Sequence, residues 1–228
     1  MKTTISKYQL ATAIAILFHA IGLLGILFFD SSFFIKATWL NLLLMFALIL
    51  YTQQKINKHF IIFLIICFAT GVITEIFGTH TGFIFGQYKY GTVLGPSIQQ
   101  VPLIIGINWF IIVYCCGIII QMMFTYIIDT LVAHGDVKRK PQALSIILDG
   151  ATLAVFFDWL MEPAAIKLGY WQWLPSGQIP VYNYLCWFVI STLMLAVFHF
   201  AQFDKQNKFA VNLLLIQAMF FLLLRTFL

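Results

Sequence analysis

The sequence predicts an all-α protein, a polytopic transmembrane bundle of about seven helices. The first observation is its composition, which is 62% hydrophobic and 9% charged, whereas soluble domains are roughly 25% charged. The second is that apolar runs close to the ~20 residues needed to cross a bilayer recur along the whole chain. We therefore expect a single transmembrane domain over residues 1–228, in a multi-pass protein of the cell membrane that is surrounded by lipid.

The breaks between apolar runs place the helices in order. The first run ends at Asp30; it is too long for the apolar core of a signal peptide, and no small-residue cleavage site follows it. Polar segments at Gln54–His59 and Asp129–Pro141 separate later runs, and Pro163 is expected to end the fifth helix. The expected helices are Lys7–Phe29, Ile35–Gln53, Phe60–Gly78, Pro102–Ile128, Gln142–Glu162, Tyr182–Phe203 and Phe209–Phe227.

The basic residues predict the orientation in the membrane. Nine of the 13 Lys and Arg residues fall in connectors on one side, and four fall on the other. By the positive-inside rule, the N-terminus is expected in the cytoplasm and the C-terminus outside. Two long aromatic connectors, near 79–101 and 164–180, are then both expected on the outer side. No basic run is long enough to indicate a nucleic-acid partner.

Three acidic residues lie near the outer ends of apolar helices. A charge within a bilayer costs several kcal/mol and usually marks function. Glu75 and Asp158 are expected at similar depths on helices that run in the same direction, and Glu162 shares a helix face with Asp158 at a spacing of four residues. For Glu162, a helix end exposed at the membrane interface is the alternative interpretation.

The same layer gathers polar and aromatic side chains from the connectors and from the next helices. Their simplest alternative role, for any one aromatic residue, is an interfacial aromatic belt. The residues predicted to be catalytic are Asp158, Glu75 and Glu162, and those predicted to bind substrate are Asn108, Trp109, Asn183, Trp187, Trp173, Tyr88 and Tyr90. The four cysteines have no metal-ligand spacing, so neither a metal site nor another cofactor is expected.

Two sets of short motifs resemble those of the carotenoid biosynthesis proteins that act as carotenoid 1,2-hydratases. The resemblance covers a core region of about 70–187. The first set is Glu75-x-x-Gly78, Phe85-Gly86-x-Tyr88-x-Tyr90, Leu94-Gly95-Pro96 and Val101-Pro102. The second is Asp158, Pro163, Trp171-x-Trp173, Ile179-Pro180-x-x-Asn183 and Trp187. This chain departs from the family pattern at Glu162-Pro163, where Asp-Pro is usual, and near Cys186, where a glycine is usual.

The resemblance implies a cofactor-independent hydro-lyase that adds water to the terminal C1–C2 double bond of an acyclic carotenoid such as lycopene. It also implies association with other enzymes of the carotenoid pathway. Hydration of an alkene needs a proton donor, a pocket for a tertiary cation and a base for water. We expect Asp158 to donate the proton, although the donor and base roles could be exchanged. Glu75 or Glu162 would orient the water with Asn183 and Asn108, and Trp109, Trp173 and Tyr88 would line the cation pocket.

Three other functions are alternatives to hydration. A lycopene cyclase would use the same protonation, but another double bond of the chain would capture the cation. A proton-coupled transporter would use the acids as a proton site. A retinal protein needs a Schiff-base lysine in its last helix, and Phe209–Leu224 contains none.

Overall fold

The computed structural model describes residues 5–133, 142–174 and 177–228. Within these ranges, six helices are long and apolar enough to cross a membrane, so the predicted transmembrane helical bundle is confirmed. These are α1 (Lys7–Phe28), α4 (Lys58–Thr81), α5 (Ile104–Ala133), α6 (Gln142–Lys167), α7 (Val181–Phe200) and α8 (Lys208–Phe227).

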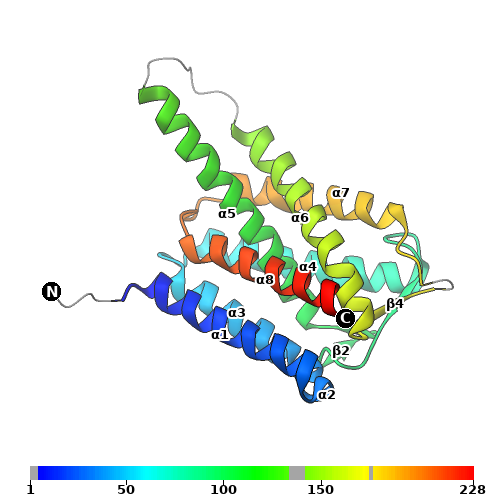
Figure 1. Ribbon diagram of the computed structural model, residues 1–228. Coiled ribbons are helices and arrows are strands. Elements are labelled where there is room, and N and C mark those ends of the chain that lie inside the picture. The colour runs from blue at the N-terminus through cyan, green and yellow to red at the C-terminus, as the bar shows by residue number, and fades with distance from the viewer. Residues whose placement is uncertain (1–4, 134–141, 175–176) are drawn as a thin grey trace.

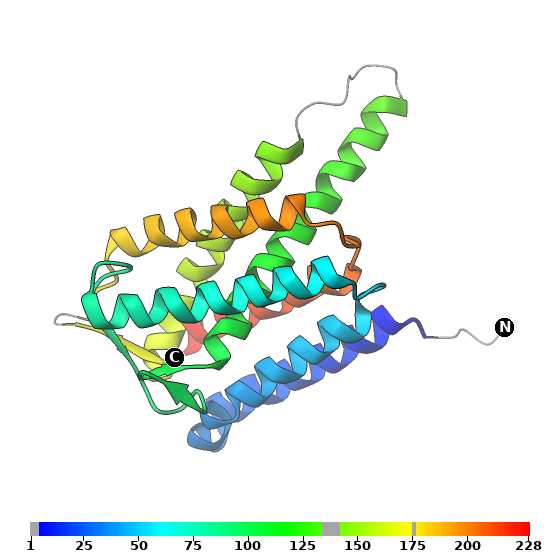
Figure 2. The same ribbon diagram turned by 180° about the vertical axis from the view of Figure 1, so that it is seen from behind.

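The second expected helix is divided into two. Helix α2 (Ser31–Lys36) begins at Asp30, whose side chain accepts a hydrogen bond from the Phe33 N–H, and α3 (Thr38–Thr52) follows after Ala37. With 15 residues, α3 is about 22 Å long, shorter than the ~30 Å hydrocarbon core of a bilayer. It lies alongside α1, and the two helices form one edge of the bundle (Figures 1 and 2).

The prediction that Pro163 ends a helix is wrong, because α6 continues through it to Lys167. Proline removes one backbone hydrogen bond but is tolerated inside membrane helices, where neighbouring groups satisfy the freed carbonyl. The helix ends instead at Lys167, and the turn that follows contains Gly169, which adopts a φ of 71° while the Tyr170 N–H donates to the Ala165 carbonyl. Glu162 therefore lies within the helix and is 2% exposed, which argues against the interface-exposed alternative.

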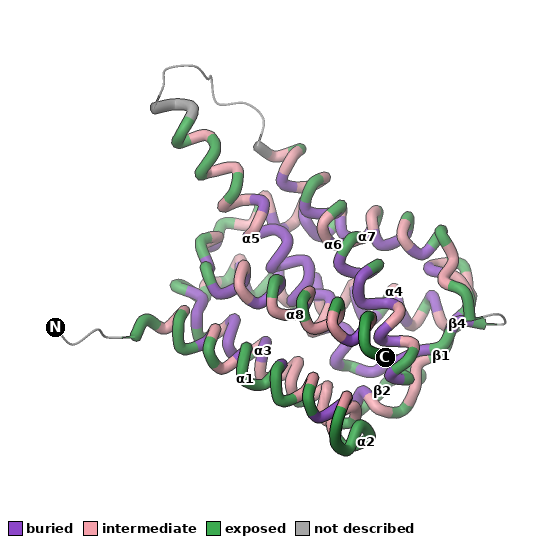
Figure 3. The backbone as a smooth tube through the Cα atoms, viewed as in Figure 1, coloured by how far each residue is buried: buried purple, intermediate pink, exposed green. Residues whose placement is uncertain are grey.

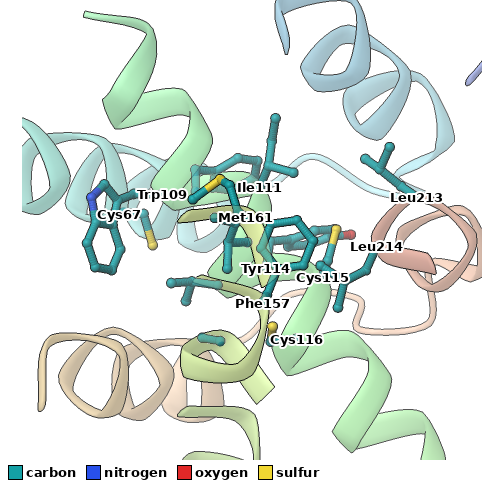
Figure 4. Close-up of a cluster of buried hydrophobic side chains, with 14 of the residues drawn as sticks. Cys67, Trp109, Ile111, Tyr114, Cys115, Cys116, Phe157, Met161, Leu213 and Leu214 are labelled. Atoms are coloured by element: carbon teal, nitrogen blue, oxygen red, sulfur yellow. The ribbon is translucent and has the colours of Figure 1, made fainter. Parts of the chain in front are cut away.

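Helix α5 is the centre of the bundle and packs against α3, α4, α6, α7 and α8. Its middle segment is buried in Figure 3, and residues 110–116 are fully enclosed. Figure 4 shows Tyr114, Cys115 and Cys116 of this segment among side chains from α6 and α8. The four cysteines of the chain are free and buried, as expected for small apolar side chains rather than metal ligands.

The two aromatic connectors meet at one end of the bundle. Strand β1 (Tyr88–Tyr90) of the first pairs antiparallel with β4 (Trp171–Trp173) of the second, and β2 (Ser97–Ile98) forms a hairpin with β3 (Val101–Pro102). Helix α8 ends beside these strands, whereas α1 begins at the opposite end (Figures 1 and 2). We call the β1–β4 ribbon the lid. That this end faces the outside remains a prediction from the charge distribution.

Candidate active site

A small cavity lies beneath the lid, and we call it the acid cavity. Its volume is about 30 Å³, which is enough for one or two water molecules. Helices α4, α5, α6 and α7 and both connectors contribute to its wall. The structure brings all ten residues predicted for the site to this wall, namely Glu75, Tyr88, Tyr90, Asn108, Trp109, Asp158, Glu162, Trp173, Asn183 and Trp187.

Four further residues complete the wall, and they were not among the predicted site residues: Phe85, Ile105, Met161 and Trp171. Trp171 belongs to the Trp-x-Trp motif, and its place two residues before Trp173 could have indicated a shared role. Met161 could have been found from its position between Asp158 and Glu162. Phe85 belongs to the Phe-Gly-x-Tyr-x-Tyr motif, which could have indicated it, whereas Ile105 carries no signal that separates it from ordinary core residues.

Glu75 is held by three donors. The hydroxyl groups of Tyr88 and Tyr90 donate to its Oε2 at 2.5 and 2.7 Å, and the indole N–H of Trp109 donates to Oε1 at 3.1 Å. Burial is the main cause that raises the pKa of Tyr88 and Tyr90, so both phenols stay protonated and can donate at physiological pH. Because a carboxylate accepts but does not donate, this arrangement matches an ionised Glu75.

Glu162 is held from the other strand of the lid. The indole N–H groups of Trp171 and Trp173 both donate to its Oε2 at 3.0 Å. Its Oε1 makes no hydrogen bond to any residue that the structure describes. Side chains two residues apart in a strand point to the same face. This explains why both tryptophans of the Trp-x-Trp motif in β4 donate to one carboxyl group.

The same alternation explains the Tyr-x-Tyr motif. Tyr88 and Tyr90 lie two residues apart in β1 and reach one oxygen of Glu75. The antiparallel register places Tyr88 opposite Trp173 and Tyr90 opposite Trp171. The four aromatic residues therefore share the inner face of the lid, and each strand holds a different acid.

Asp158 differs from the other two acids. It is 1% exposed, and its Oδ2 accepts one hydrogen bond, from the Asn183 side-chain amide at 2.9 Å. Its Oδ1 is buried and has no hydrogen-bond partner among the described residues. Asn108 lines the cavity as well. Asp158 is thus the acid with the fewest donors around it.

Trp109 is fixed by close packing. Its ring stacks on that of Trp187 with centroids 3.8 Å apart and planes 16° from parallel. On its other side lies Gly71 of α4, where an added Cβ atom would come within 2.7 Å of the Trp109 ring. Glycine at this position lets α4 approach α5 closely enough for Trp109 to reach Glu75.

Replacing Glu75 by glutamine is expected to destabilise the protein. A glutamine amide can turn its NH₂ group toward the Trp109 N–H, which places a donor against a donor. It can instead turn that group toward the two tyrosine hydroxyls, which then accept from it and leave their own protons without the acceptor that Glu75 supplies. We expect a loss of about 1–3 kcal/mol in unfolding free energy, measured as a lower thermal midpoint in detergent. Replacing exposed Lys89 of β1 by alanine is the control. An unchanged midpoint for Glu75→Gln would contradict the three-donor arrangement.

Comparison with known proteins agrees with these features. The family profile described as carotenoid biosynthesis protein matches residues 36–228. This chain belongs to that family. The matched segment includes every residue that lines the acid cavity. No solved structure matches the chain.

One curated relative is a protein from Haloarcula japonica, named bisanhydrobacterioruberin hydratase. It is 23% identical over 134 residues, which cover 58% of this chain and 41% of that protein. The chain therefore matches less than half the length of this relative. Together with the family membership, the similarity supports a carotenoid-modifying role for a multi-pass membrane protein.

Proposed function

We propose that this family member is a carotenoid 1,2-hydratase, which adds water to the terminal C1–C2 double bond of an acyclic (ψ) end group. The observation that carries the proposal is the acid cavity, in which three carboxyl groups surround a space of the size of one or two water molecules. The name of the haloarchaeal relative supports the same reaction.

Asp158 is the proton donor in this mechanism. Among the residues that the structure describes, no Lys, Arg or His lines the acid cavity, so repulsion between three carboxylates favours a proton on one of them. Glu75 and Glu162 each receive at least two hydrogen bonds from strong donors, whereas Asp158 receives one and leaves Oδ1 without a partner. A protonated Oδ1 can therefore be aimed at the substrate.

Glu162 is the base, and Glu75 stabilises the cation. Glu162 keeps Oε1 free of protein hydrogen bonds, so this oxygen can accept a hydrogen bond from water. Glu75 has both oxygens occupied, which leaves it as a fixed negative charge near the reacting carbon. The faces of Trp109, Trp173 and Tyr88 contribute up to about 2 kcal/mol each to a desolvated cation.

The reaction proceeds in two steps, protonation of the alkene and capture of the cation by water. Asp158 transfers its proton to C2, the π electrons form the new C–H bond, and a tertiary cation remains at C1. Water, held by Asn183 or Asn108, attacks C1 and gives its proton to Glu162. Return of that proton to Asp158 through the cavity restores the enzyme, and the net change is alkene plus water to tertiary alcohol.

We also propose where the enzyme lies in the cell and how it is oriented. The whole chain, 1–228, forms one transmembrane domain in the cell membrane, with the N-terminus in the cytoplasm and the catalytic core between 70 and 187. The chemistry requires no cofactor. Association with other enzymes of the carotenoid pathway would deliver a substrate that does not dissolve in water.

Expression in a lycopene-producing host tests the reaction. We expect carotenoids heavier than lycopene by one or two waters, identified by chromatography with mass spectrometry. An isomeric cyclic product would indicate a lycopene cyclase instead. Unchanged pigments together with pH-driven uptake of a small molecule would favour a proton-coupled transporter.

A further inference from the structure

A second, larger cavity lies beside the acid cavity, and we call it the apolar cleft. Its volume is about 360 Å³, within the ~300–1,000 Å³ range of small-molecule sites. Side chains of α1, α2, α3, α5, α6 and α8 line it, and most of them are apolar. This cleft could not be predicted from the sequence, because its walls come from helices far apart in the chain.

The apolar cleft and the acid cavity share part of their walls. Ile105, Asn108, Met161 and Trp171 line both. These four residues form a partition between a space for an apolar chain and a space for water. Methionine is a flexible side chain that adapts to its neighbours, so Met161 can move aside more easily than a ring could.

The other side of the cleft opens to the surface of the bundle. Phe18 and Ile21 of α1 line the cleft and are each 45% exposed, and Leu40 of α3 is 53% exposed. In a membrane-spanning bundle, an apolar surface at this position faces lipid. A substrate dissolved in the bilayer could therefore enter between α1 and α3 without crossing water.

Two amide side chains give the otherwise apolar wall of the cleft a polar spot, where water can bind beside an apolar ligand. Asn41 and Gln217 line it, and the side-chain oxygen of each has no hydrogen-bond partner among the described residues. Gln217 is 4% exposed. Buried polar atoms are nearly always hydrogen-bonded, so these two oxygens are expected to accept from water, because an isoprenoid hydrocarbon has no donor.

We infer that the apolar cleft holds the isoprenoid chain of the substrate, and that the end group reaches the edge of the acid cavity at Asn108 and Met161. This inference rests on the proposed function and adds the route and binding site of the chain. It assigns the selection of a long acyclic chain to α1, α3 and α8, outside the helices that carry the acids.

Filling the cleft tests the inference. Gly22 of α1 lines the cleft, and an added Cβ atom would lie 3.8 Å from the nearest atom of Phe220, which is ordinary contact. Gly22→Phe should reduce by about tenfold both the lycopene that co-purifies with the protein and the fraction hydrated in membranes. Leu24→Phe is the control, because Leu24 is 51% exposed and lines neither cavity.

Site protection gives a second test that does not depend on a bulky substitution. Ile21→Cys places a thiol on the cleft wall, whereas the four native cysteines are buried. We expect lycopene to slow alkylation of Ile21→Cys by a membrane-permeant maleimide, and not to slow that of Leu24→Cys. Equal rates with and without lycopene at Ile21→Cys would overturn the inference.

The outcomes separate this inference from the proposed function. If the wild-type chain hydrates lycopene and Gly22→Phe does so equally well, the cleft assignment is wrong and the function stands. If the wild-type chain retains lycopene in the cleft, with protection at Ile21→Cys, but never hydrates it, the cleft assignment stands and the function fails.

Discussion

Asp158→Asn is expected to abolish hydration, with a loss of about 10²–10⁴-fold, the usual contribution of a general acid. Asparagine has nearly the same shape and can still accept the hydrogen bond from Asn183, but it cannot transfer a proton to an alkene. The measurement is the hydrated fraction of carotenoid in membranes of a lycopene-producing host, at matched protein levels.

Asp149→Asn is the matched control for this substitution. Asp149 lies on the same helix, is exposed and does not line the acid cavity, so the same chemical change there should leave hydration at the wild-type level. If Asp158→Asn retained wild-type hydration, Asp158 could not be the donor.

Glu162→Gln is expected to cause a comparable loss, about 10²–10⁴-fold, with little change in stability. The glutamine oxygen can still accept both indole N–H groups of Trp171 and Trp173, and its NH₂ group then occupies the position of the free Oε1. The hydrogen bonds to the lid are therefore kept, but the side chain can no longer accept a proton from water. Hydration assays combined with thermal unfolding in detergent measure the two effects separately.

The conservative variant Glu162→Asp sharpens this prediction. It retains a carboxylate with shorter reach, and aspartate is the residue expected before this proline from the family motif. We expect partial hydration activity. Full activity in Glu162→Gln would exclude Glu162 as the base, whereas a large loss of stability would show that its main role is to hold the lid.

The candidate site could be predicted because its residues lie at the same ends of helices that run in known directions. Once Glu75 and Asp158 were placed on parallel helices, Asn108 and Asn183 had to start the following helices at the same depth. These four residues line the acid cavity, although the segments that carry them are far apart in the sequence.

Other features depend on contacts that periodicity does not encode. Pairing of β1 with β4 joins two connectors about 80 residues apart, and neither connector alone shows a partner. The break at Ala37 has no proline or glycine to mark it. Continuation of α6 through Pro163 depends on the surrounding bundle, and local propensity predicted the opposite.

The lid also determines when the proposed hydration can occur. One strand supplies two donors to Glu75 and the other supplies two to Glu162, so moving the paired strands away from the helices would release both carboxyl groups together. When the lid opened, bulk water would enter the acid cavity, and Glu75 and Glu162 would no longer be held in position. In the proposed mechanism, the carbocation would therefore form only while the lid is closed and the acid cavity already holds its water.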